Sequence, residues 1–283
     1  MAENTKSAKT SIKPDLASIA GLMVAFGGIL GGLIIEGGKL KDVAQFTAAM
    51  IVLGGTAGAV MVSLPLKVIM GGLRRLKGVF FDSTPDFAAM IQEVIGYATK
   101  ARKNGLVSLE GEASTIADPF LKKAMTLAVD GTDLQELRKM LELEICIEEE
   151  HAEAEAKVFE CAGGYAPTVG IIGAVMGLIQ VMKNLANIDE VGHGIAVAFV
   201  ATVYGVGVSN LLLLPAANKI KARAHAETKR KELILEGVTG IVEGLNPKLI
   251  RAKLESYIQG GPVVKEKKSS EKSGVKAPVS AEA

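Results

Sequence analysis

Charged residues are almost absent from four stretches of this 283-residue sequence, although they make up 22% of the chain. The clearest two lie between positions 167 and 215 and are separated by a short polar break. The first run reads PTVGIIGAVMGLIQVMKN, and the second reads GIAVAFVATVYGVGVSNLLLLP. Each run is roughly 18–20 residues long, enough for a helix to cross a ~30 Å hydrocarbon core. Apolar residues gathered in blocks indicate a membrane protein with a soluble part. A net charge of +1 gives no reason to expect nucleic-acid binding.

Cysteines and enzyme motifs are also scarce. Cys146 and Cys161 are the only cysteines, and about 22 Å separates them on one predicted helix, too far for a disulfide. We interpret them as reduced cytosolic thiols, with pairing between chains as the alternative. No Walker motif, dinucleotide fingerprint, nucleophile elbow or zinc spacing occurs, so we expect neither an enzyme nor a cofactor. Glu148 and Glu155 flank His151 at helical spacing, but a solvated acidic face is far commoner than a metal site, and we predict no metal.

Two more apolar runs lie earlier in the chain, at residues 16–35 and 44–64. The first follows a polar start with lysines, but it is long and lacks a convincing cleavage site, which argues against a signal peptide. A basic cluster comes directly after the second run, so the positive-inside rule places this side in the cytoplasm. The N-terminus, two spans earlier, is then cytoplasmic too. The cluster consists of Lys67, Arg74, Arg75 and Lys77.

The predicted fold is an all-α integral membrane protein with four transmembrane helices and a helical cytoplasmic domain between spans two and three. No period-2 alternation of useful length appears in that domain, and a capping-box spacing at Thr132 and Gln135 predicts the start of its last long helix. The predicted parts are a cytoplasmic N-terminus (1–14), spans one and two (15–64), the helical domain (65–163), spans three and four (164–217), C-terminal cytoplasmic helices (218–259) and a disordered tail (260–283).

Small residues recur at four-residue spacing in the spans, as at Gly173 and Gly177. In lipid, close backbone approach through glycine faces is a main source of helix association. The pattern is compatible with packing within one chain and with packing between chains.

No Asp, Glu, Lys or Arg lies in the interior of a predicted span. Because a protein that moves ions usually needs an ionisable group in the membrane, either no ion moves or a partner supplies the carboxylate. Hydroxyls in the spans are expected to bond back to their own helix, and Thr202 stands out because it lies in mid-span beside Tyr204.

Pro167 and Pro215 lie near the cytoplasmic ends of spans three and four. They have an ordinary interpretation, in which Pro167 occupies a tolerated first turn and Pro215 frees one carbonyl near a helix end. They are also compatible with a hinge that couples the spans to the soluble domain.

The segments PTVGIIGAVMGLI, AFVATVYGVGVSNLLLLP and ARKNGLVSLEGE resemble the MotA family of flagellar motor stator subunits, PomA-like sodium-motor relatives included, within the MotA/TolQ/ExbB superfamily. The resemblance extends over about residues 15–255 and covers the order of spans, soluble block and basic C-terminal segment. It implies an ion-conducting subunit of the bacterial inner membrane, with both termini cytoplasmic. Such a subunit forms a pentameric ring around a MotB-like dimer, whose single span carries an essential Asp, and it drives the rotor protein FliG during flagellar rotation and chemotaxis.

The same resemblance implies roles for individual residues. Arg102 and Glu110 correspond to the charged pair that meets FliG, although helix-dipole complementation explains both charges as well. Pro167 and Pro215 match two prolines implicated in conformational coupling.

The resemblance also places the ion path along Ala174, Thr202 and Tyr204. Sodium-type relatives carry a Thr at the position of Ala174, so one oxygen ligand is missing here, and we favour H⁺ over Na⁺.

Two other functions remain open at this stage. An ExbB- or TolQ-like energiser of outer-membrane transport is the first, and such relatives characteristically have only one span before the soluble block. The second is a membrane-bound enzyme or receptor with a helical cytosolic domain. Activity of the chain without a carboxylate-bearing partner would favour this alternative.

Overall fold

The computed structural model describes residues 13–82 and 86–258, which are almost entirely helical. Four helices are long and apolar enough to cross a membrane, which confirms the predicted all-α membrane fold. The predicted tail at 260–283 and most of the predicted N-terminal segment lie outside the described residues. The helices are α1 (Leu16–Ile35), α2 (Leu40–Val43), α3 (Phe46–Ser63), α4 (Leu66–Val79), α5 (Phe87–Asn104), α6 (Glu110–Ala113), α7 (Pro119–Val129), α8 (Leu134–Lys183), α9 (Ile188–Val208), α10 (Leu214–Val242) and α11 (Pro247–Ile258).

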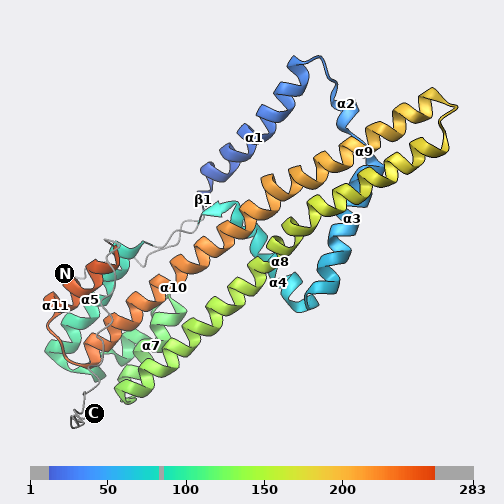
Figure 1. Ribbon diagram of the computed structural model, residues 1–283. Helices are drawn as coiled ribbons and strands as arrows, with labels where there is room; N and C mark the ends of the chain where they lie inside the picture. The colour runs from blue at the N-terminus through green and yellow to red at the C-terminus, as the bar shows by residue number, and fades with distance from the viewer. Residues whose placement is uncertain (1–12, 83–85, 259–283) are drawn as a thin grey trace, which may run out of the picture.

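Two very long antiparallel helical rods form the axis of the molecule (Figure 1). One rod is α8, which runs without a break through 50 residues. The other consists of α9, a π-helical turn at Ser209–Leu213, and α10, and it also continues from the apolar part into the soluble part. Each rod therefore connects a membrane span directly to the soluble domain.

The soluble domain gathers at the lower end of the rods, where α5, α7 and α11 pack against α8 and α10 (Figure 1). Its core contains fully buried leucines from four different elements, including Leu109, Leu121, Leu141 and Leu254. A short 3₁₀ turn at Leu106–Leu109 joins α5 to α6. The strands β1 (Lys13–Pro14) and β2 (Phe81–Asp82) make a single antiparallel pairing at the junction with α1.

The first helix, α1, stands apart from the two rods (Figure 1). None of its residues is buried, and a Cβ placed on any of its glycines would meet nothing within 4 Å. In contrast, α3 crosses the rods and buries Ala48, Val52, Thr56 and Val60 against them. Lipid or other chains must therefore cover most of α1.

Three details of the sequence-based interpretation are wrong. The last long helix of the soluble domain does not end at the predicted boundary at residue 163 but continues into the third span, and Pro167 lies deep inside α8 rather than in a first turn. Pro215 lies in the first turn of α10, but the π-helical turn before it joins α9 to α10, so the rod does not end there. The N-cap of α8 is Asp133, whose carboxylate accepts hydrogen bonds from two backbone N–H groups, rather than Thr132. In lipid an interrupted helix would leave backbone groups unpaired, so the rods continue through these breaker residues.

Candidate functional site

The seam between α8 and α9 is built from glycine and alanine. A Cβ on Gly170 would lie 2.9 Å from the carbonyl oxygen of Ala201 and 3.2 Å from the Cα of Gly205. A Cβ on Gly177 would lie 2.7 Å from the carbonyl oxygen of Gly194. The two backbones are thus in direct contact along the seam, as small residues in membrane helices allow.

The predicted packing residues Gly173 and Gly177 both belong to this seam. Gly173 faces Ala201 of α9 and Ile51 of α3, and both glycines are buried. These two positions therefore pack within the chain. A Cβ on Gly54 or Gly58 of α3 would meet nothing within 4 Å, so their small faces are open to contacts outside the chain.

The predicted ion-path residues Ala174 and Thr202 lie in the same part of the α8–α9 pair. Gly170 packs against the Cα of Thr202, and Ala174 is one helical turn further along α8. Both Ala174 and Thr202 are half-buried. The hydroxyl of Thr202 donates to the carbonyl of Ala198 over 3.3 Å, so it is bonded back to its own helix as expected.

Tyr204 lies where α9 packs against α3. Its hydroxyl donates to the carbonyl of Val43 over 2.5 Å and accepts from the N–H of Gln45 over 3.3 Å. Its ring packs with the cluster formed by α3 and α9. The hydroxyl of Tyr204 is thus engaged by the link between α2 and α3, and its place on the ion path stays a prediction.

The spans contain no charged side chain that could bind an ion. No Asp, Glu, Lys or Arg occurs at 16–35, 46–63, 164–182 or 191–217. On the outer face of α8 the side chains are apolar and exposed, as at Ile171, Val175, Leu178 and Met182. This surface must be covered by lipid or by another chain.

The two prolines lie where the rods leave the apolar part. Pro167 is half-buried in α8, and Pro215 is exposed in the first turn of α10. Ser209, the first residue of the π-helical turn, donates a hydrogen bond to the carbonyl of Gly163 over 2.6 Å. Irregular backbone therefore concentrates at the junction between the spans and the soluble domain.

The predicted rotor-facing residues lie on the surface of the soluble domain. Arg102 is in the last turn of α5, and Glu110 opens α6 after a turn in which Gly105 has φ of +82°. Both side chains are exposed, and neither forms an ion pair within residues 13–82 and 86–258. Lys100 and Glu112 lie next to them and pair at 2.7 Å, whereas Arg102, Glu110 and the neighbouring Lys103 are exposed and have no ion pair in the described part of the chain.

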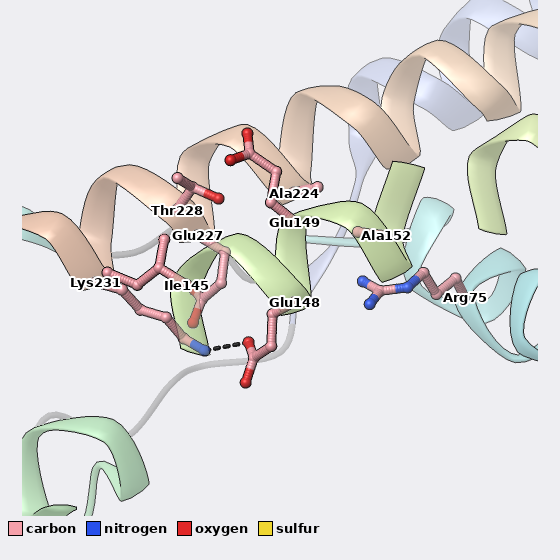
Figure 2. A pocket seen from close by; sticks show the side chains of 9 residues that line it. All are labelled: Arg75, Ile145, Glu148, Glu149, Ala152, Ala224, Glu227, Thr228 and Lys231. Atoms are coloured by element: carbon pink, nitrogen blue, oxygen red, sulfur yellow. Dashed lines mark hydrogen bonds and ion pairs between the residues drawn. The ribbon is translucent and has the colours of Figure 1, made fainter. Parts of the chain in front are cut away.

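The acidic run around His151 is used for packing between helices. Glu148 pairs with the buried Lys231 of α10, and Glu155 pairs with Arg75 of α4. Figure 2 shows the Glu148–Lys231 pair beside a small cavity between α8 and α10. Its volume of about 40 Å³ holds a few water molecules at most. In the described part of the chain no three potential ligands meet at one point.

A cluster at the base of α1 was missed by the sequence-based reasoning. Asp15 caps α1, and its carboxylate also pairs with Lys219 and Arg223 of α10. Hydrogen bonding to Lys219 and to the N–H of Ser18 lowers the pKa of Asp15, which lies just outside the span, from 3.8 to about 2. The only sequence signal for this cluster is an Asp directly before an apolar run. The cluster could not be predicted from it, because the partners of Asp15 are 204 and 208 residues away in the sequence.

Two family descriptions match the chain. Residues 112–233 match the MotA/TolQ/ExbB proton channel family, and residues 19–105 match the N-terminal part of motility protein A. Motility protein A of Bacillus subtilis (strain 168) is 36% identical over 248 residues, which cover 86% of this chain and 91% of the relative.

Solved structures show the same similarity. A structure of C. jejuni MotAB is matched with a TM-score of 0.82 at 32% identity, over 91% of this chain and 99% of the other. The flagellar MotAB stator complex of Bacillus subtilis is matched with a TM-score of 0.78 at 34% identity, over 85% and 95%.

Proposed function

We propose a function from one premise: the chain belongs to the MotA/TolQ/ExbB proton channel family, on its motility protein A branch. It is an ion-conducting stator subunit of a flagellar motor, a multi-pass inner-membrane protein that works with a MotB partner in an oligomeric assembly. The similarity extends over nearly the whole chain, and this observation carries the conclusion.

An ExbB- or TolQ-like role is disfavoured by the N-terminal half of the chain. Two apolar helices, α1 and α3, precede the soluble domain, and the match at 19–105 is specific to motility protein A. ExbB- and TolQ-like relatives are expected to have one span there. The family is one of stator ion channels rather than of enzymes, and we propose that the chain catalyses no covalent chemistry.

We infer that the MotB-like partner supplies the acid that binds the ion. The spans of this chain have no Asp, Glu, Lys or Arg in their interiors, and a protein that conducts ions usually needs an ionisable group there. The half-buried Ala174 and Thr202 would then form one wall of the path beside a partner span. Ala174 has no oxygen to offer, whereas the hydroxyl of Thr202 donates its hydrogen to the carbonyl of Ala198 and keeps its oxygen lone pairs. The missing oxygen at Ala174 favours H⁺ over Na⁺ as the conducted ion.

The two rods provide the route from the ion path to the rotor. Because α8 and the α9–α10 rod are continuous, a displacement in the spans moves the soluble domain with them. We propose that Arg102 and Glu110, the exposed charges on that domain, contact FliG. Exposed complementary charges steer fast association without deep burial, which suits a contact that forms and releases repeatedly.

We also propose a pentameric ring with both termini in the cytoplasm. The unburied α1 and the open glycine faces of α3 offer surface for neighbouring copies. Basic residues after α3 and along α10, such as Arg74 and Arg223, support a cytoplasmic location for these ends.

Deletion and complementation test the function. In a motile strain that lacks its own copy, this chain and its MotB-like partner together should restore swimming, whereas either protein alone should not. Restoration by this chain without any partner would contradict the proposed role. A strain that swims normally after deletion of both would contradict it as well.

A further inference from the structure

Pro167 leaves a gap in the hydrogen bonding of α8. Its ring has no N–H, so the carbonyl of Gly163, four residues earlier, has no donor in its own helix. Gly163 is buried in the contact between the rods. An unpaired carbonyl in such a place costs free energy, so a donor from elsewhere is required.

Ser209 provides that donor from the other rod. Its hydroxyl donates to the carbonyl of Gly163 over 2.6 Å, and its side chain is 1% exposed. Serine and threonine in helices commonly bond to their own preceding turn, as Thr202 does with Ala198. Ser209 instead bonds to a carbonyl 46 residues away in the sequence.

The backbone around Ser209 is irregular at the same point. Ser209 opens the π-helical turn that ends at Leu213, two residues before Pro215. A Cβ on Gly163 would lie 2.6 Å from Cδ2 and 2.8 Å from Cγ of Leu214, so a larger residue at 163 would have to displace the leucine side chain. The proline gap in α8 and the π-helical turn of the second rod therefore meet directly. Single π-helical turns are frequent at functional sites, since they mark places where a helix can rearrange.

We propose that Ser209 is a positioning residue for energy coupling. Its hydroxyl closes the gap that Pro167 opens and thereby fixes the register between the two rods where the spans enter the soluble domain. The hydrogen bond itself rests on the geometry alone. Its part in torque generation rests on the proposed function, and separate measurements test the two claims.

A double-mutant cycle tests the hydrogen bond. In the complex with the partner, Ser209→Ala should lower the melting temperature by about 3 °C or more, because a buried acceptor loses its donor. In a Pro167→Ala background the loss should largely vanish, since residue 167 then donates its own N–H to Gly163. An equal loss in both backgrounds, or none in the first, would overturn the assignment.

A matched control is available one residue beyond the proline. Thr168 donates its hydroxyl to the carbonyl of Tyr165 over 2.8 Å, within the same helix. Thr168→Ala removes a hydroxyl that also donates to a backbone carbonyl, but it leaves the hydrogen bond between Ser209 and the carbonyl of Gly163 in place. Its effect on the melting temperature should be small and should be the same with and without Pro167.

Torque per stator unit tests the coupling role, and it remains informative if Pro167→Ala fails to assemble. With Ser209→Ala we expect torque per unit to fall by about two-fold or more, while the number of units per motor stays unchanged. Ser209→Cys keeps a weak donor and should give an intermediate torque. Unchanged torque per unit, or a loss explained entirely by fewer units, would refute the positioning role. If the wild-type chain gave no torque at all, the proposed function would fail, and the melting cycle would still decide the hydrogen bond.

Discussion

A single methyl group on Gly205 should push the two rods apart. The added Cβ would lie 2.5 Å from the carbonyl oxygen of Ala166 and 3.1 Å from the Cα of Gly170. These are backbone atoms of α8, which cannot rotate away as a flexible side chain would. Overpacking costs about 1–3 kcal/mol, and the rigid backbone contact puts Gly205→Ala near the upper value. Replacing Gly by Ala in a helix returns about 1 kcal/mol. The net destabilisation is then about 2 kcal/mol.

Thermal unfolding of the complex with its partner measures this effect. A destabilisation of this size corresponds to a drop in melting temperature of about 4–8 °C. Gly207→Ala is the matched control, because it lies on the same helix and its Cβ would meet nothing within 4 Å. We expect the control to leave the melting temperature unchanged or raise it. Equal melting temperatures for the two variants would refute the idea that direct backbone contact holds the α8–α9 seam.

Three further predictions concern the rotor surface, the base of α1 and the conducted ion. Reversal of either exposed charge, Arg102→Glu or Glu110→Lys, should lower torque at high load without changing the number of assembled units. The control Lys139→Glu, at an exposed position of α8, should have no effect on torque. Full torque of both reversed variants would contradict the assigned contact with FliG. Asp15→Asn should lower the melting temperature of the complex, because Lys219 and Arg223 lose their shared carboxylate. Since the pKa of Asp15 is lowered in the folded state, its contribution should be constant above about pH 4 and disappear as the pH falls towards about 2, and a wild-type advantage that persists below pH 2 would contradict this. Swimming should persist without sodium and stop with a protonophore, and the opposite dependence would overturn the choice of protons.

The spans and the fold class could be predicted from sequence because membrane solvation leaves few choices. A run of apolar residues such as 16–35 must be helical in lipid, and its predicted bounds agree with those of α1. The helical nature of the soluble block followed from its spacing of apolar residues. These are local properties, and they do not depend on which helix lies beside which.

The continuity of the rods could not be predicted in the same way. Gly163, Gly164 and Pro167 are helix breakers in a soluble setting, and only the neighbouring Ser209 shows how the freed carbonyl is paired. The Asp15 cluster and the bonds of Tyr204 likewise join residues far apart in the sequence. Whether a hydroxyl points along an ion path or into a packing contact depends on such tertiary partners.

The central claim is that this chain forms one wall of an ion path whose acidic residue belongs to the partner. Ion flux through reconstituted complexes tests this claim most directly. The chain alone, the chain with its partner, and the chain with a partner whose membrane Asp is replaced by Asn would be placed in vesicles with a pH-sensitive dye. We expect proton flux only with the intact partner. Comparable flux through the chain alone, or through the complex with the Asn partner, would contradict the account.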